Sequence, residues 1–225
     1  MRRGIVPASF PRHVAMQKKK PAAKVPVHGP QHAKQVRIIG GSWKRTPLPV
    51  LEAQGLRPTP DRVRETVFNW LNHLKGDWGN LRVLDLFAGS GALGFEAASR
   101  GAQQVTMVDA NATIVRQLQA IQEKLNATNI VVQRADALAL AQSLAQRGQR
   151  FDVIFLDPPY QEDFLTRALP LCDKLVSEGG LVYAESGLPL VSDEGESPEW
   201  LANWDVVRQD KAGMVHFHLL QRRAV

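Results

Sequence analysis

From Leu81 onward, short apolar runs alternate with longer amphipathic segments, and this alternation limits the folds open to the 225-residue chain more than any other feature. Such runs between helical patterns are typical of strands buried on both faces, as in a parallel sheet covered by helices. The predicted strands are Arg82–Leu86, Val105–Val108, Ile130–Gln133, Val153–Leu156 and Leu181–Glu185. The predicted helices are Ala92–Ser99, Ala112–Leu125, Ala137–Arg147 and Phe164–Leu175. Gly101 and the Gly179-Gly180 pair are expected to end the helices before them.

The segments on either side of this alternating region have a different pattern. After it, an antiparallel hairpin on the sheet edge is predicted from Val206–Gln209 and Val215–Leu220. Before it, a small hairpin is predicted from Val36–Ile39 and Leu48–Leu51. A helix is predicted after the small hairpin, with Thr59 or Asp61 as its cap and Pro60 near its first turn. Its apolar stripe is predicted to contain Val63, Val67, Trp70, Leu71 and Leu74.

Charge is unevenly distributed along the chain. The net charge is +6, yet residues 1–51 contain eleven Lys and Arg and no Asp or Glu, so the remaining 174 residues carry −5. A basic, acid-free arm binds phosphates through counterion release, although a solvated tail that binds nothing specific has the same composition. We expect residues 1–35 to be a disordered tail, 36–56 an RNA-binding extension and 57–225 the catalytic domain.

Composition also indicates the cellular compartment in which the protein works. Cys172 is the only cysteine, which excludes an internal disulfide and a cysteine metal cluster. No apolar run has the length of a membrane span, and the basic N-terminus lacks the apolar core of a signal peptide. A mitochondrial-type presequence stays open, because this region is basic and lacks acids. A cytoplasmic location fits best.

In an open α/β sheet, ligands bind beyond the carboxyl ends of the strands, so the loops there are the candidate site. Asp85 ends the first predicted strand, and Gly89, Gly91 and Gly94 after it form G-x-G-x-x-G, a pattern that brings backbone close to a ligand. Asp109 ends the second strand and can accept from the hydroxyls of a ribose. Asp136 follows the third strand, where it can accept from an adenine amine or cap the next helix.

The fourth loop is Asp157-Pro158-Pro159-Tyr160. The Asp157 carboxylate and the Pro158 carbonyl can both accept from one exocyclic NH₂ group. Tyr160 offers a ring face on which a planar base can stack. Two acceptors aimed at one amine orient its nitrogen toward an electrophile, so this loop is the candidate reaction centre.

Five longer segments occur in the order RIIGGSWKRTPLPV, GLRPTPDRVRETVFNWL, LDLFAGSGALGFEAASRGA, FDVIFLDPPY and KAGMVHFHLL. On these segments, residues 36–222 resemble the bacterial RsmD family of class I S-adenosylmethionine-dependent methyltransferases, and DPPY is similar to the motif of amino methyltransferases. The resemblance implies an α/β, Rossmann-like class I methyltransferase fold. Its sheet would be mostly parallel and seven-stranded, with a C-terminal antiparallel hairpin and a small N-terminal β-hairpin extension.

The resemblance also implies an activity and its site residues. The family methylates the N2 amine of one guanine, guanine 966, in 16S rRNA, with S-adenosylmethionine and no metal, as a monomer. The substrate is either naked RNA or a 30S subunit. The implied catalytic residues are Asp157, Pro158, Pro159 and Tyr160. The implied cofactor-binding residues are Thr59, Asp85, Phe87, Ala88, Gly89, Ser90, Gly91, Asp109, Ala110, Asp136 and Ala137. The expected RNA-binding residues are Arg37, Trp43, Lys44, Arg45, Arg57, Arg62 and Arg64.

Three other functions remain open on the residues alone. G-x-G-x-x-G with Asp109 also fits an NAD-dependent oxidoreductase, which leaves DPPY unexplained. A non-catalytic RNA-binding assembly factor is a second possibility. A methyltransferase acting on adenine N6, cytosine N4 or a glutamine amide is a third, because DPPY alone does not identify the amine. His216 and His218 alternate along a predicted strand and are expected to be structural or RNA-facing.

Overall fold

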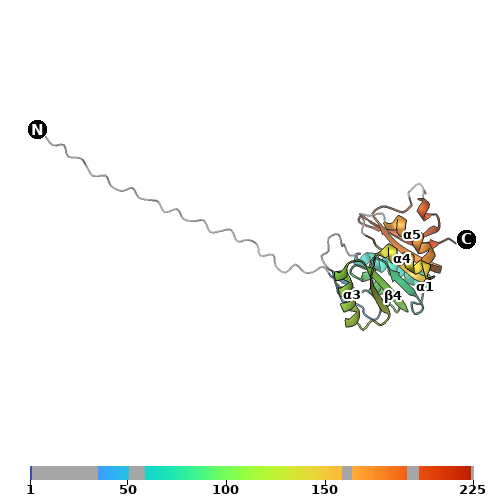
Figure 1. Ribbon diagram of the computed structural model, residues 1–225, viewed down its shortest axis with the longest axis horizontal. Helices are drawn as coiled ribbons and strands as arrows, with labels where there is room; N and C mark the ends of the chain where they lie inside the picture. The colour runs from blue at the N-terminus through green and yellow to red at the C-terminus, as the bar shows by residue number, and fades with distance from the viewer. Residues whose placement is uncertain (2–34, 51–58, 159–163, 192–197, 224–225) are drawn as a thin grey trace. The chain divides into compact units, whose positions relative to one another are not determined.

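A seven-stranded sheet forms the centre of the compact unit Ala33–Val225 (Figure 1). The computed structural model describes Met1 and residues 35–50, 59–158, 164–191 and 198–223, and Ala33–Val225 forms one compact unit. The strand order is β5-β4-β3-β6-β7-β9-β8. The strands are β3 (Arg82–Asp85), β4 (Gln104–Asp109), β5 (Ile130–Arg134), β6 (Phe151–Leu156), β7 (Val176–Ser186), β8 (Trp204–Ala212) and β9 (Val215–Arg222).

Strands β3 to β7 are parallel, and the hairpin of β8 and β9 joins antiparallel to β7. The α/β class, the mostly parallel sheet and the edge position of the C-terminal hairpin are therefore confirmed. The chain runs outward from β3 to β4 and β5 and then returns to β6 on the other side of β3. This reversal between β3 and β6 is a topological switch point, where open α/β sheets bind their ligands.

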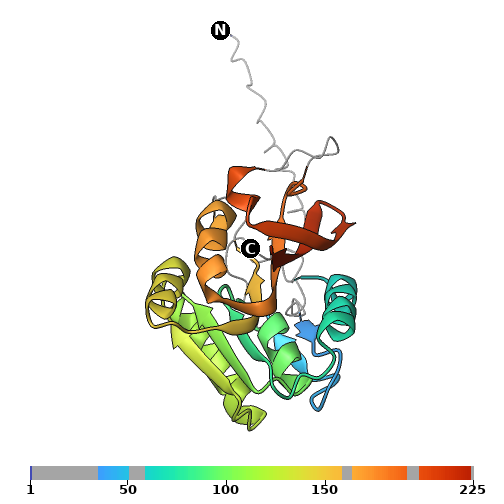
Figure 2. The same cartoon turned by 90° about the vertical axis from the view of Figure 1, so that its right-hand side faces the viewer.

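Helices cover both faces of the sheet (Figure 2). One core contains side chains of α1 (Asp61–Lys75), α2 (Ala92–Ser99) and α3 (Ala112–Lys124). The second core contains side chains of α4 (Ala137–Gln146), α5 (Phe164–Leu175) and the short 3₁₀ helix η1 (Glu199–Leu201). Because the central strands β3, β4 and β6 are buried on both sides, their apolar runs are continuous rather than alternating.

Three local predictions are wrong. Gly179-Gly180 lies inside β7, because α5 ends at Leu175 and the chain enters β7 at the next residue. Neither Thr59 nor Asp61 caps α1: Pro60 occupies the N-cap position, and no side-chain hydrogen bond caps the helix. Leu74 is 40% exposed, whereas Phe68 is buried and stacks on Trp78 at 5.5 Å between ring centroids.

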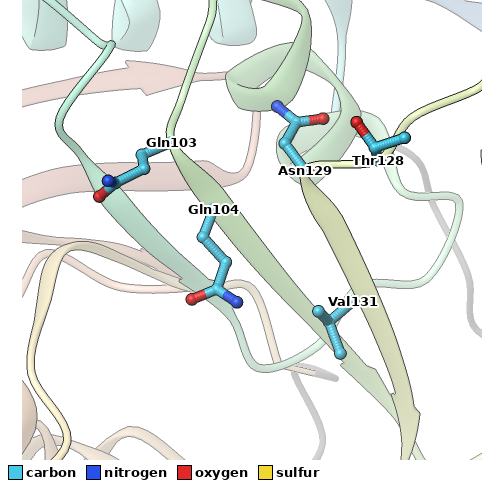
Figure 3. Close-up of a pocket in the computed structure, with 5 residues that line it drawn as sticks. All are labelled: Gln103, Gln104, Thr128, Asn129 and Val131. Atoms are coloured by element: carbon cyan, nitrogen blue, oxygen red, sulfur yellow. The ribbon is translucent and has the colours of Figure 1, made fainter.

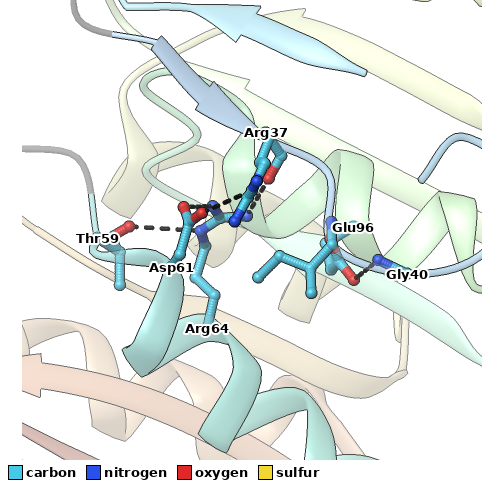
Figure 4. A network of polar contacts seen from close by, with 7 residues as sticks. Arg37, Gly40, Thr59, Asp61, Arg64 and Glu96 are labelled. Carbon is cyan, nitrogen blue, oxygen red and sulfur yellow. Dashed lines mark hydrogen bonds and ion pairs between the residues drawn. The ribbon is translucent and has the colours of Figure 1, made fainter. Parts of the chain in front are cut away.

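The N-terminal hairpin consists of β1 (Gln35–Arg37) and β2 (Pro47–Pro49), which confirms the predicted pairing. It is bound to α2 through buried polar side chains (Figure 4). The Glu96 carboxylate accepts from the backbone N–H groups of Ile39 at 2.6 Å and Gly40 at 2.9 Å. Gly41 has φ +73°, and a Cβ at this position would lie 1.9 Å from the Ser99 carbonyl oxygen, so the contact requires glycine.

Arg64 joins the same network from α1 and is fully buried. Its guanidinium donates to the backbone oxygens of Arg37 at 2.8 Å and Thr59 at 3.3 Å, and to Asp61 Oδ1 at 2.6 Å (Figure 4). A fully buried guanidinium whose N–H groups are used inside the fold cannot contact RNA, so the predicted RNA-binding role of Arg64 is wrong. Its role is to connect α1 to β1 and to the segment before α1.

Candidate active site

Acidic side chains gather at the carboxyl ends of the parallel strands. Asp85 ends β3 and Asp109 ends β4, while Asp157 follows β6 directly and Glu185 lies one residue before the end of β7. Asp85 pairs in register with Phe155, and Leu156 pairs with Ala184, so Asp85, Asp157 and Glu185 occupy neighbouring strands at one edge. The topology therefore brings together residues that are a hundred positions apart in the sequence.

The loop between β3 and α2 has a tight, glycine-dependent conformation. Gly89 has φ +49° and Gly91, the N-cap of α2, has φ +79°. A Cβ on Gly91 would lie 2.6 Å from Phe95 and 2.7 Å from Leu118. Ala88 fixes the loop by donating its N–H to the Val108 carbonyl at 2.8 Å. The loop thus presents backbone and no bulky side chain where a ligand approaches.

Asp85 is 1% exposed, and its two oxygens have different surroundings. Oδ2 accepts from the Gly94 N–H at 3.1 Å, whereas Oδ1 is buried without a hydrogen-bond partner among the described residues. Burial raises the pKa of Asp85 to about 7, although the backbone N–H groups of Gly94 and Phe87 oppose the shift. A buried acceptor without a donor lowers the stability of the folded protein. A cationic ligand that donates a hydrogen bond to Oδ1 removes this penalty, which favours its binding.

Asp109 and Asp136 are both tied to backbone at their strand ends. Asp109 accepts from the N–H groups of Gly89 at 3.1 Å and Asn111 at 2.8 Å, which joins the end of β4 to the β3 loop. Burial raises the pKa of Asp109. Asp136 is exposed and caps α4 by accepting from the Ala139 N–H at 2.8 Å, so the capping interpretation is confirmed. Its adenine-binding role stays a prediction.

Asp157 lies between a hydroxyl donor and a second carboxylate. Thr59, which is buried, donates its hydroxyl to Asp157 Oδ2 at 3.0 Å. On the other side lies the negatively charged Glu185, whose Oε1 accepts from the Tyr183 hydroxyl at 2.5 Å. Burial and the negative charge of Glu185 raise the pKa of Asp157 well above its usual range.

Glu185 and Tyr183 were not among the predicted site residues. The sequence contained a signal for Glu185, because this acid ends a predicted apolar strand in the same way as Asp85 and Asp109 do. None of the five segments on which the family resemblance rests contains it, so those segments assign it no role. Pro158 is buried beside Asp157, whereas Pro159, Tyr160 and Arg57 lie outside the described residues.

The other predicted cofactor residues differ in exposure. Ala88 and Ala137 are buried, Ser90 is half-buried and Ala110 is exposed. The half-buried Phe87 ring packs edge-on against Phe164 at 5.2 Å between centroids, which connects the β3 loop to the start of α5.

The residues present fit S-adenosylmethionine, a cationic nucleoside, better than a dinucleotide. The methionine part carries an ammonium and a sulfonium, and both are favoured near the Asp85 carboxylate. A pyrophosphate placed at Gly89–Gly91 would instead face the buried Asp85 carboxylate. The orphaned Oδ1 of Asp85 is where the ammonium would be held. Within the described ranges, no group of three or more His, Cys, Asp or Glu is arranged to hold a metal ion.

The predicted RNA-binding residues fall into two places. Arg37 and Arg62 are exposed near the start of α1, and Arg37 forms a 3.0 Å ion pair with Asp61. Lys44 and Arg45 are also exposed, but their turn is bound to Ser99 at the end of α2 far from Gly91. Eight helical residues separate those ends by about 12 Å. Trp43 is half-buried and packs against the core.

His218 is structural, which confirms one of the two predicted alternatives. Its ring is buried, and its Nε2 accepts from the Leu190 N–H at 3.4 Å. Burial lowers the pKa of His218 to about 4, so the ring stays neutral at physiological pH.

A separate open pocket lies away from these carboxylates, beside the starts of β4 and β5 (Figure 3). It is lined by Gln103, Gln104, Thr128, Asn129 and Val131. The Asn129 amide donates to the carbonyls of Ala102 and Ala98, so this side chain is used within the fold. The pocket is at the amino ends of the strands, opposite the edge where the sheet topology places a ligand. None of the helices in the described parts of the chain is long and apolar enough to cross a membrane.

Proteins of known family are similar to this chain over most of its length. The family model described as Conserved hypothetical protein 95 matches residues 36–221. Ribosomal RNA small subunit methyltransferase D of Escherichia coli (strain K12) is 40% identical over 196 residues, which cover 84% of this chain and 91% of that protein. The protein of the same name from Haemophilus influenzae is 36% identical over 202 residues, covering 87% and 98%.

A solved structure is also similar to this chain. The Escherichia coli protein yhhF is 39% identical and superposes with a TM-score of 0.70, covering 85% of this chain and 100% of that one. With the strand order, this match confirms the predicted class I methyltransferase fold. The chain therefore belongs to the Conserved hypothetical protein 95 family, the RsmD family that includes the ribosomal RNA small subunit methyltransferases D.

Proposed function

We propose that this protein is an S-adenosylmethionine-dependent methyltransferase of small-subunit ribosomal RNA and that it methylates the N2 amine of a guanine. The relatives named for small-subunit rRNA support the RNA class. The family resemblance points to guanine 966 of 16S rRNA, either naked or within a 30S subunit, and to a monomer acting in the cytoplasm. The basic residues 1–51 are suited to such a polyanionic substrate.

The observation that carries the proposal is that two carboxylates with different roles, Asp85 and Asp157, lie close together. Asp85 has a buried oxygen that lacks a donor among the described residues, and its charge acts on Asp157 across the switch point between β3 and β6. A cationic methyl donor held by Asp85 is then next to an amine held by Asp157. Positioning of this kind supplies about 7–11 kcal/mol of a barrier in favourable cases.

S-adenosylmethionine supplies a methyl group on a sulfonium, whose sulfur keeps the bonding pair while the guanine nitrogen gains the methyl group and releases one proton. The chain holds and orients the reactants. Asp85 would bind the ammonium, and Asp109 would accept from the ribose. Asp157 and the Pro158 carbonyl would accept the two N–H bonds of the amine, which turns its lone pair toward the methyl group. A base paired inside RNA must be unstacked to reach this edge.

Mass mapping of methylated nucleotides in rRNA from cells with and without the protein tests this function. We expect one N2-methylguanine to disappear from the small-subunit RNA when the protein is absent and to return when it is supplied. Methyl groups missing from adenine N6 or cytosine N4 instead would contradict the guanine assignment. Isothermal titration calorimetry with S-adenosylmethionine and, separately, with NAD tests the cofactor. Binding of NAD without binding of S-adenosylmethionine would contradict the proposal.

A further inference from the structure

The Thr59 hydroxyl is directed at the reaction centre rather than at its own helix. Thr59 precedes Pro60, the N-cap of α1, yet no side-chain hydrogen bond caps this helix. The hydroxyl donates instead to Asp157 Oδ2 at 3.0 Å, across 98 positions of the sequence. A hydroxyl has a single hydrogen, so while Thr59 is bonded to Asp157 it cannot also donate to a cofactor or to RNA.

The neighbouring residues hold the Thr59 side chain in place. A residue before proline is restricted to extended backbone, and Pro60 imposes this restriction on Thr59. The fully buried Arg64 of α1 donates its Nε–H to the Thr59 carbonyl at 3.3 Å. The branched Cβ of threonine also restricts χ1. The hydroxyl is therefore held in one position before a substrate binds, as a group that supports a catalytic side chain must be.

Thr59 and Asp157 differ in exposure. Thr59 is 5% exposed, whereas Asp157 is half-buried at the end of β6. A substrate can therefore reach the Asp157 carboxyl, while Thr59 is almost entirely covered. A carboxylate has about four positions at which it accepts hydrogen bonds. The Thr59 hydroxyl occupies one of them and fixes the plane of the group, which leaves the others for an amine.

We propose that Thr59 is a positioning residue, whose hydrogen bond to Oδ2 fixes the rotation of the Asp157 carboxylate so that this group accepts from the target amine in one orientation. This role differs from the cofactor contact that the family resemblance implies for Thr59. The effect on methyl transfer rests on the proposed function, whereas the orientation of Asp157 does not.

The same hydrogen bond affects the ionisation of Asp157. The titratable groups around Asp157 are Asp85 of β3, Glu185 and Tyr183 of β7, and Arg64 of α1, which bonds to the Thr59 carbonyl. Burial and the two acids raise the pKa of Asp157, whereas the Thr59 hydroxyl stabilises the ionised form and lowers this pKa. Loss of the hydroxyl should therefore raise the pKa of Asp157 further. The acid limb of kcat, which follows the ionised acceptor, should move to higher pH.

Two substitutions separate the Thr59 hydroxyl from the rest of its side chain. Thr59→Val keeps the branched shape without the hydroxyl, whereas Thr59→Ser keeps the hydroxyl. With S-adenosylmethionine and 16S rRNA from cells that lack the protein, kcat of Thr59→Val should fall about tenfold or more, as expected for a lost hydrogen bond to a charged group. Thr59→Ser should recover most of this loss. KM for S-adenosylmethionine should stay unchanged in both variants.

Thr66→Val is the matched control, because it removes a hydroxyl from α1 that donates to the Arg62 carbonyl at 3.0 Å and not to the site. We expect this variant to have the kcat and the pH profile of wild type. Circular dichroism shows whether each variant is folded. A role confined to stability would lower the melting temperature of Thr59→Val and leave its acid limb where it is in wild type.

Carbon NMR of the free protein tests the orientation of Asp157 without substrate. The carboxyl signal of Asp157, identified by its loss in Asp157→Asn, should titrate at higher pH in Thr59→Val than in wild type, Thr59→Ser and Thr66→Val. The proposal is overturned if this titration is the same in all of them, if Thr59→Ser is as slow as Thr59→Val, or if the loss appears in KM for S-adenosylmethionine instead of kcat. Methylation of another base would contradict the guanine assignment and leave these comparisons intact.

Discussion

Asp85 is a single side chain whose protonation affects both stability and ligand binding. Its pKa is about 7 in the folded protein against 3.8 for an unperturbed carboxyl, mainly because of burial. The folded state therefore binds more protons than the unfolded state between these values, so stability falls as pH rises through this window. Above it the ionised carboxylate destabilises the fold until a cationic ligand satisfies Oδ1.

Asp85→Asn should therefore be more stable than wild type at high pH. We expect the difference in the free energy of unfolding to grow between about pH 4 and 7 and to reach at most about 4 kcal/mol. Urea unfolding at a series of pH values measures it, and a difference independent of pH would contradict the assignment. The same variant should bind S-adenosylmethionine more weakly, because the ammonium is left without its counter-charge.

Asp157→Ala separates binding from chemistry. We expect single-turnover methyl transfer to fall by two orders of magnitude or more, because the amine is left without its oriented acceptor. Calorimetry should give a Kd for S-adenosylmethionine close to that of wild type, since Asp85 and Asp109 are intact. Near-normal transfer by this variant would remove Asp157 from the reaction.

At the scale of elements, the contact between the N-terminal hairpin and α2 depends on Gly41. Gly41→Ala combines a left-handed φ with a Cβ 1.9 Å from a backbone oxygen. Gly148→Ala is a matched control, because Gly148 follows the C-cap of α4 with φ +68° and nothing lies within 4 Å of its added Cβ. We expect about 1–2 kcal/mol of destabilisation for Gly148→Ala and clearly more for Gly41→Ala. Thermal melts measure both, and equal destabilisation would show that the close contact is relieved without cost.

Elements whose stabilisation is local were predictable from their own sequences. Helices α2 and α5 have the predicted bounds, because apolar periodicity and the flanking residues define them. Gly179-Gly180 misled the prediction, since a glycine pair inside β7 has the same sequence signature as a helix end. Phe68 was overlooked because its partner Trp78 lies beyond the end of α1.

At the scale of the whole molecule, the candidate site was predictable because one topological rule places all the strand ends together. Asp85, Asp109 and Asp157 follow from that rule. Arg64 was misjudged because its role depends on contacts with segments that are distant in the sequence. An arginine in a basic region looks exposed from its sequence, and only its acceptors reveal that it is buried.

The charge distribution predicts a salt-dependent contribution of the N-terminal region to RNA binding. Residues 2–34 contain eight Lys and Arg and no acid. Their removal should weaken RNA binding and reduce the slope of log K against log salt by about 0.7 for each phosphate that the shortened protein no longer neutralises. A variant with Lys18, Lys19 and Lys20 changed to Gln should show part of the effect. An unchanged slope would indicate a region that binds nothing specific.

The buried Arg64 also determines where this protein can be divided. The guanidinium donates to the Arg37 carbonyl of β1, to Asp61 and to the Thr59 carbonyl. The Thr59 hydroxyl in turn donates to Asp157. A protein that begins at α1 would lack the Arg37 oxygen that accepts from Arg64, and it would expose the core side chains that pack on Val36, Ile38 and Leu48. We expect this shortened protein to be less stable than the full chain and more prone to aggregate. The hairpin therefore sets a lower limit on how far the folded unit can be trimmed.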